Sequence, residues 1–123
     1  MDSEALGRAG EKAAERYMKK NGYRILDRRW RCPEGELDLV AEKGGEVVFV
    51  EVKTRASEVF GGARLAVDAR KASRLRVAAY AYLERHLLWE SPFRIDVIAV
   101  TATPDSRTAR LEHLVSAVDE NVS

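Results

Sequence analysis

The sequence predicts an α/β fold in which a mixed central sheet of four to five strands is flanked by helices. Apolar residues recur at helical spacing in two long segments, and shorter apolar or alternating segments bounded by glycine and proline lie between and after them. The resulting order is one helix, three strands, a second helix and two strands, which suits helices packed on a sheet. At this length we expect residues 1–123 to form a single domain with a substantial hydrophobic core.

Both helices are predicted from the spacing of their apolar residues. The first is expected over residues 4–20, with a stripe formed by Leu6, Ala9, Ala13, Ala14 and Tyr17. Asn21-Gly22 ends this helix, because a helix exit commonly needs a residue with positive φ. The second is expected over residues 69–87, with a stripe formed by Leu75, Ala78, Ala79, Tyr82 and Leu83.

The strands are predicted from short segments that end in turn sequences. We expect them at residues 23–31, 36–42, 46–53, 93–100 and 109–114. Lys43-Gly44-Gly45 joins the second strand to the third as a tight hairpin, and connections are expected at 56–62 and 104–106. The third strand contains a Val-Val-Phe-Val segment that is apolar on both faces, so it should be central in the sheet.

The net charge of +1 conceals an uneven distribution of charged residues. Between Lys53 and Arg76 seven cationic residues stand against two anionic ones. A second basic cluster around Trp30 consists of Arg28, Arg29 and Arg31. Phosphate backbones are attracted to such clusters. A solvated helix face together with a basic hairpin explains them equally well, so charge alone leaves both interpretations open.

The composition excludes several classes of protein. No apolar run approaches the roughly 20 residues that a membrane-spanning helix needs. The charged N-terminal segment lacks the apolar core of a signal peptide. Since Cys32 is the single cysteine, an internal disulfide and a cysteine-rich zinc site are both excluded. We therefore expect a cytoplasmic protein that does not associate with a membrane.

Acidic residues and a lysine concentrate on the two strands of the predicted hairpin. Because side chains alternate along a strand, Glu36 shares one face with Asp38, and Glu51 shares one face with Lys53. The short connection should pair these strands directly and bring two or three carboxylates together. Like charges at such a distance repel one another. A hard divalent cation such as Mg²⁺ relieves the repulsion by taking the carboxylate oxygens as ligands.

A metal bound there would activate a water and polarise a phosphate, with Lys53 orienting the water or neutralising developing charge. The alternative interpretation places these residues on the solvated face of an antiparallel sheet. Val47 and Phe49 share the face of Glu51 in the alternation, however, and their apolar character indicates a half-buried charged cluster. The sequence therefore favours a metal site.

The spacing of these residues also resembles a known nuclease signature. Asp38 followed by Glu51-Val52-Lys53 resembles the metal-binding and catalytic signature of the PD-(D/E)XK superfamily, and the order of elements resembles its restriction endonuclease-like core. Residues 35–39 and 49–55 also resemble the YraN-like family of bacterial proteins, which is largely uncharacterised and described as distantly related to Holliday junction resolvases. Leu37 replaces the proline that often precedes the first acidic residue of the superfamily signature.

The resemblance implies specific roles at the hairpin. Asp38 and Glu51 would be ligands of Mg²⁺ or Mn²⁺, with the Val52 carbonyl as a third ligand. Lys53 would be the catalytic lysine. The implied reaction is endonucleolytic hydrolysis of DNA phosphodiester bonds, including those of branched or junction DNA. The alternative is a catalytically inactive nucleic-acid-binding or protein-interaction domain with the same fold, and RNA stays open as a substrate.

Two further acids are candidates for the same site. Glu11 matches the place where related nucleases supply an additional catalytic and metal-binding acid from the first helix, and a plain surface glutamate is its alternative. Glu36 would be a second ligand or would position Lys53. Asp96 lies within an otherwise apolar strand, where we expect a structural role or an indirect one. His86 and His113 lack metal-ligand spacing, so we expect packing or surface roles for both.

A nucleic-acid partner, expected to be DNA, would be held by cationic residues near the site. The candidates are Arg29, Arg31, Arg55, Lys71 and Arg74. Lys71 and Arg74 are three residues apart and therefore share one face of the second helix, although a solvated face explains them nearly as well. A homodimer would suit an enzyme that cuts two symmetric strands of a junction, but no feature of the sequence requires one.

Overall fold

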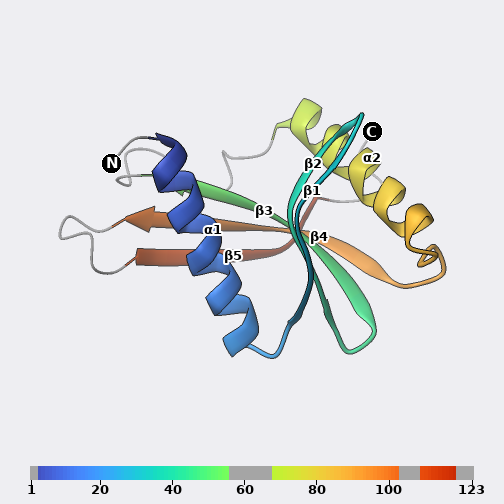
Figure 1. Ribbon diagram of the computed structural model, residues 1–123, viewed down its shortest axis with the longest axis horizontal. Helices are drawn as coiled ribbons and strands as arrows, with labels where there is room; N and C mark the ends of the chain where they lie inside the picture. The colour runs from blue at the N-terminus through green and yellow to red at the C-terminus, as the bar shows by residue number, and fades with distance from the viewer. Residues whose placement is uncertain (1–2, 56–67, 103–108, 119–123) are drawn as a thin grey trace.

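The computed structural model describes residues 3–55, 68–102 and 109–118, which form two helices and five strands (Figure 1). The helices are α1 (Ser3–Lys20) and α2 (Ala69–Arg85). The strands are β1 (Arg24–Cys32), β2 (Gly35–Lys43), β3 (Glu46–Arg55), β4 (Phe93–Ala102) and β5 (Ala109–Val118). The connections expected at 56–62 and 104–106 lie outside the described residues. Neither described helix combines the length and the apolar character that crossing a membrane requires.

The five strands form one mixed sheet in the order β1-β2-β3-β4-β5. Strands β3 and β4 are parallel, whereas the other three neighbouring pairs are antiparallel. Helix α2 stands between the two parallel strands in the chain, as the crossover connection that parallel strands require. The predicted α/β fold is confirmed, and β3 occupies the central place that its apolar sequence indicates.

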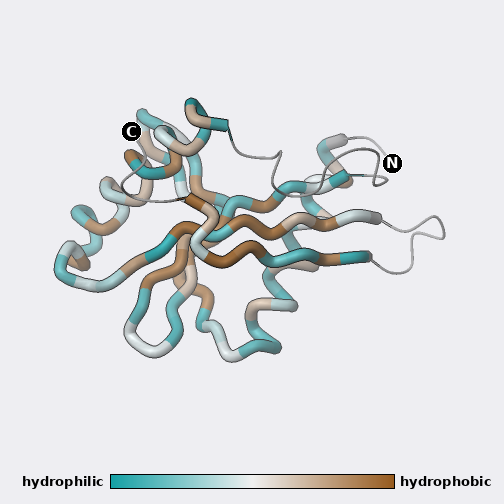
Figure 2. The backbone as a smooth tube through the Cα atoms, turned by 180° about the vertical axis from the view of Figure 1, so that it is seen from behind, coloured by the Kyte–Doolittle hydropathy of each residue, from teal (hydrophilic) through white to brown (hydrophobic). Residues whose placement is uncertain are grey.

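The two helices cover opposite faces of the sheet, and each closes its own part of the hydrophobic core. The α1-side core includes Ala14, Met18, Val48, Val50 and Ile98. The α2-side core includes Phe49, Leu75, Ala79, Tyr82 and Ile95. Figure 2 shows hydrophobic residues concentrated along the central strands between these layers. Side-chain alternation along β3 therefore directs Glu51 and Lys53 to the α2 side, the side of Phe49.

The buried face of α1 is rotated relative to the predicted stripe. Ala9 is exposed, whereas Gly10, Ala14 and Met18 are buried at every fourth position. Gly10 lets the helix approach β3 closely, because a Cβ built there would meet Thr54 Cγ2 at 2.8 Å and Thr54 Cβ at 2.9 Å. Helix α1 thus rests on β3 directly beside the part of the strand that carries the candidate site.

Replacing Gly10 by alanine is expected to lower the thermal stability of the protein. The added methyl group has no room beside Thr54, and overpacking a buried position typically costs about 1–3 kcal/mol. In a domain of this size each kcal/mol lowers Tm by roughly 4 °C. Thermal unfolding followed by circular dichroism measures the effect. Gly7→Ala is the matched control, since a Cβ at Gly7 meets nothing within 4 Å, and equal stability of the two variants would contradict the prediction.

Candidate active site

Strand β2 interrupts its side-chain alternation at Asp38. Leu37 packs in the α2-side core, whereas Leu39, two residues later, packs in the α1-side core. Backbone pairing of β2 with β3 reaches Leu39, opposite Val50. Beyond this pair the Val52 N–H donates a hydrogen bond to Asp38 Oδ2 at 2.8 Å, so a side chain takes the place of the next backbone partner. Asp38 therefore lies where the two strands separate.

The Asp38 carboxyl lies within hydrogen-bonding reach of the Glu51 carboxyl. Burial, followed by the hydrogen bond and the negative charge of Glu51, raises the pKa of Asp38 from 3.8 to about 8. The Val52 N–H opposes this shift, because it stabilises the ionised carboxylate. At neutral pH Asp38 consequently keeps its proton unless a further positive charge is supplied.

Glu51 is the more deeply buried acid of the pair, with 5% of its surface exposed. Lys71 of α2 approaches it, with Nζ 2.8 Å from Glu51 Oε2, and this contact raises the pKa of Lys71. Apart from this ion pair, no donor within residues 3–55, 68–102 and 109–118 satisfies Glu51 Oε2. A buried carboxylate needs several donors to offset its lost hydration, so the charge of Glu51 is only partly compensated.

These oxygens fit a hard divalent cation. Carboxylate and carbonyl oxygens are the protein ligands that Mg²⁺ and Mn²⁺ prefer. Asp38 and Glu51 supply two carboxylates, and the Val52 carbonyl follows Glu51 directly in β3. Within the described part of the chain no three His, Cys, Asp or Glu side chains gather closely enough to hold a metal by themselves. Water or substrate oxygens would therefore complete the coordination.

A cavity of about 150 Å³ opens on the α2 side of this pair. Its charged lining consists of Glu36, Asp38, Glu51, Lys71 and Arg74. The structure thus brings acids from both strands of the hairpin together with both candidate cations of α2. Glu36 is itself exposed, and its Oε2 lies 3.6 Å from the Nε of exposed Arg31.

The remaining candidates on β3 lie further along the strand. Lys53 is half-buried and follows Glu51 by two residues, so alternation places it on the same side of the sheet. Arg55 is also half-buried and ends the described part of β3. Both cations therefore continue the α2 side of the strand beyond the carboxylate pair.

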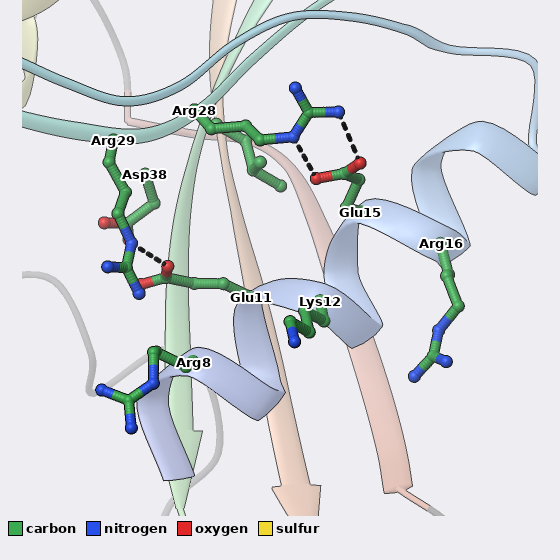
Figure 3. Close-up of a pocket in the computed structure, with 9 residues that line it drawn as sticks. Arg8, Glu11, Lys12, Glu15, Arg16, Arg28, Arg29 and Asp38 are labelled. Carbon is green, nitrogen blue, oxygen red and sulfur yellow. Dashed lines mark hydrogen bonds and ion pairs between the residues drawn. The ribbon is translucent and has the colours of Figure 1, made fainter. Parts of the chain in front are cut away.

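Glu11 reaches Asp38 from the opposite side, on α1. Its Oε1 accepts a hydrogen bond from Arg29 Nε at 2.8 Å (Figure 3). Glu11, Arg29 and Asp38 all line a second cavity, of about 540 Å³. The negative charge of Glu11 adds to the influences that raise the pKa of Asp38. Glu11 is therefore close enough to affect the site, but it is already paired with an arginine.

A second buried acid, Asp96 of β4, lies in register with Val50 on the opposite side of the sheet from Glu51. It accepts hydrogen bonds from Arg94 Nε at 3.0 Å and from the Ser116 N–H at 2.9 Å. His113 Nε2 lies 2.7 Å from its other oxygen. Burial alone would raise the pKa of Asp96, but these three partners outweigh it and lower the pKa. Unlike the negative charge of Glu51, that of Asp96 is fully compensated by donors from its own chain.

The partners of Asp96 extend this network to the edges of the core. Arg94 also donates to Glu46 Oε1 at 2.6 Å, and His113 Nδ1 lies 2.9 Å from the Tyr17 hydroxyl. The sequence indicates a structural or indirect role for Asp96 and a packing or surface role for His113, but it does not indicate that they pair. The available signal was a charged residue inside an apolar strand, which predicts a buried partner without identifying it.

The fold and the site define an α/β protein in which a buried and a half-buried carboxyl group lie together at the open end of a β-hairpin, next to lysines of a strand and a crossover helix. The chain belongs to the uncharacterised protein family UPF0102, whose model matches residues 10–100.

Relatives in this family align over nearly the whole chain. UPF0102 proteins of Frankia alni and Pelotomaculum thermopropionicum are each 48% identical to it, covering 93% and 91% of this chain and 94% and 93% of their own lengths. A solved structure of SfsA from Pyrococcus furiosus in complex with Ca²⁺ is 18% identical, with a TM-score of 0.44. That alignment covers 92% of this chain and 64% of the SfsA chain.

Proposed function

We propose that this protein is a metal-dependent endonuclease of the PD-(D/E)XK superfamily that hydrolyses phosphodiester bonds in DNA, including branched or junction DNA. The observation that carries the proposal is the convergence of Asp38 and Glu51, with only the Lys71 ion pair reaching Glu51 Oε2 among the described residues. A surface that only binds DNA gains nothing from this arrangement, because it destabilises the fold. A divalent cation makes the same arrangement favourable. The resemblance to the YraN-like family supports the same assignment.

Each ligand candidate is positioned by a neighbouring group. Asp38 and Glu51, with the Val52 carbonyl, would hold Mg²⁺ or Mn²⁺, which lowers the pKa of a bound water and polarises a phosphate. The Val52 N–H keeps Asp38 turned toward β3. Lys71 Nζ, 2.8 Å from Glu51 Oε2, holds that carboxylate in place. For Glu11 to serve as a further ligand, it would exchange its pairing with Arg29 for the metal.

Lys53 is the group that we assign to the reacting phosphate. It lies on the same side of β3 as Glu51, where its ammonium group orients the attacking water or neutralises charge that develops on the phosphate. Lys71 is engaged with Glu51 and lines the smaller cavity together with Arg74, so these two cations attract the DNA backbone to the site. Arg55, at the end of β3, extends the same positive side.

Replacing Lys53 by alanine is expected to separate catalysis from metal binding. With Mg²⁺ or Mn²⁺ the wild-type protein should cleave labelled DNA, and Lys53→Ala should reduce the rate by about 10²–10⁴-fold, the usual effect of losing a group that transfers a proton or stabilises charge. Its Mn²⁺ affinity, measured by calorimetry, should stay close to that of the wild type, because Lys53 is not a ligand. Lys43→Ala, at the end of β2 that is remote from the carboxylate pair, is the control.

The substrates should be four-way junction, duplex and single-stranded DNA, tested side by side. Cleavage of none of them by the wild type with either metal would overturn the proposal. Salt-dependent DNA binding without Mn²⁺ binding that depends on Asp38 and Glu51 would instead identify an inactive nucleic-acid-binding domain. Cleavage confined to RNA would support metal-dependent phosphodiester hydrolysis but would make RNA, not DNA, the substrate.

A further inference from the structure

Asp38 faces two cavities, and the roles assigned above use only the smaller one. The larger cavity, of about 540 Å³, lies between α1 and the β1–β2 hairpin. Five cationic side chains line it, namely Arg8, Lys12, Arg16, Arg28 and Arg29. Its three acidic residues are Glu11, Glu15 and Asp38. The cavity therefore carries an excess of positive charge even when every acid is ionised, and Asp38 of the carboxylate pair is part of its lining.

Three of these cations form a stripe along one face of α1. Arg8, Lys12 and Arg16 stand at every fourth position, so they are neighbours on the helix surface. At about 1.5 Å per residue the stripe is about 12 Å long, which is the advance of roughly three nucleotides at about 3.4 Å each. Lys12 and Arg16 are exposed, and neither forms an ion pair with any residue in the described ranges. Their charges are therefore available to a ligand.

The arginines on the β1 side of the cavity are held in position from α1. Arg28 donates hydrogen bonds of 2.6 and 2.7 Å to the two oxygens of Glu15, and Arg29 donates one of 2.8 Å to Glu11 (Figure 3). The hydrogen bond from Arg28 lowers the pKa of Glu15 to about 2, so this pair stays charged at neutral pH. A guanidinium group has five N–H donors, and these pairs leave others for phosphate oxygens.

We propose that the α1-side cavity is a second phosphate-binding subsite, which takes the sugar–phosphate backbone of the nucleic acid on one side of the bond to be cut. Lys71 and Arg74 take the backbone on the other side, and Asp38, which lines both cavities, marks the crossing point. This inference rests on the proposed function, because it names where that site holds its substrate. It assigns binding roles to Arg8, Lys12 and Arg16 that the sequence does not indicate.

A pair of matched double variants tests the subsite. Lys12→Gln/Arg16→Gln removes two positive charges from the cavity, and Lys20→Gln/Arg24→Gln removes two exposed positive charges that do not line it. Fluorescence anisotropy should measure binding of a labelled DNA duplex over a range of salt concentrations, with EDTA present to prevent cleavage. Thermal unfolding should confirm that both double variants fold.

The cavity variant should lose affinity by at least about tenfold and show a shallower dependence of log Kd on log salt, by about 0.9 for each lost phosphate contact. The control variant should bind within about twofold of the wild type. In cleavage assays the cavity variant should need more DNA for half-maximal rate, with the rate at saturation retained, as for a lost binding contact.

The outcomes separate the two proposals. Equal affinities and salt slopes in the two double variants would overturn the subsite, whether or not the wild type cleaves DNA. A wild type that binds but never cleaves, while the cavity variant alone loses affinity, would overturn the nuclease and support the subsite. A wild type that does not bind DNA at any salt concentration would overturn both.

Discussion

Asp38→Asn is expected to abolish Mg²⁺-dependent cleavage and, at the same time, to raise the stability of the metal-free protein. Asparagine keeps an oxygen that can accept the Val52 N–H, which lies 2.8 Å from Asp38 Oδ2. It carries no charge to repel Glu51 and is a poor ligand for a hard cation compared with a carboxylate. The same change would therefore weaken the proposed metal site and relieve the repulsion.

The pH dependence of this stabilisation follows from the raised pKa of Asp38. In the folded metal-free protein the pKa is about 8, against 3.8 for the free side chain. Between these values the folded state binds more protons than the unfolded state, so the contribution of Asp38 to stability falls as pH rises and is lowest above pH 8. The advantage of Asp38→Asn should thus be small near pH 4 and greatest above pH 8.

Thermal unfolding in EDTA at pH 5 and at pH 9 measures the effect. At pH 9 the variant should unfold about 4 °C or more above the wild type, which corresponds to roughly 1 kcal/mol. Added Mg²⁺ should raise Tm only in the wild type, because only a protein that binds the ion is stabilised by it. Glu34→Gln, an exposed acid in the turn before β2, is the control. Equal stability of Asp38→Asn and wild type at pH 9 would contradict the raised pKa.

Asp96→Asn is expected to have the opposite effect and to destabilise the protein strongly at neutral pH. The change removes a fully buried charge from Arg94, His113 and Ser116, whose donors surround it. Removing one partner of a buried pair typically costs about 3–5 kcal/mol, which is a large part of the 5–15 kcal/mol that stabilises a typical domain. Urea unfolding at pH 7 measures the loss.

The difference between Asp96→Asn and the wild type should vanish in acid. The pKa of Asp96 is lowered in the folded state, so the unfolded state binds more protons in the acid range. The stabilisation is therefore complete above the pKa of the unfolded chain, about 3.9, and is lost as pH falls through the lower folded value. Glu112→Gln, an exposed acid on β5, is the control. A neutral-pH loss below about 1 kcal/mol would contradict the role of Asp96.

The carboxylate pair could be predicted from the sequence because a short hairpin determines its register. The Lys43-Gly44-Gly45 turn sets Lys43 opposite Glu46, and the same register continues to Leu39 opposite Val50. Asp38 and Glu51 come next in this series, so the turn and the register predict that they lie near each other, although backbone pairing itself ends at Leu39. The central position of β3 followed in the same way from its apolar faces.

Other parts of the site depend on tertiary packing, which no local pattern encodes. Lys71 reaches Glu51 only because α2 packs across the sheet, and Glu11 reaches Asp38 only because Gly10 lets α1 approach β3. The alternation from which the shared face of Glu36 and Asp38 was predicted is interrupted between Leu37 and Leu39, yet both acids line the smaller cavity.

Pairs of residues far apart in the chain could not be predicted from the sequence for the same reason. Asp96 and His113 meet through the register of β4 with β5, and His113 meets Tyr17 across 96 residues of chain. Each of these residues is ordinary in its own segment, and only the assembled sheet and helix bring them into one network. A charged residue in an apolar strand signals that a partner exists, but the partner's identity is a property of the fold.

The surroundings of Asp96 and Glu51 can be compared directly, because both acids lie in the same sheet. Both are buried acids, one in register with Val50 and the other at the next position of β3, on opposite faces of the same two strands. Asp96 has a full set of donors from its own chain, whereas among the described residues Glu51 Oε2 has only the ion pair with Lys71. To use this fold as an inert scaffold, a protein engineer would therefore give Glu51 a full set of hydrogen-bond donors like that of Asp96. Asp96 itself would be left unchanged.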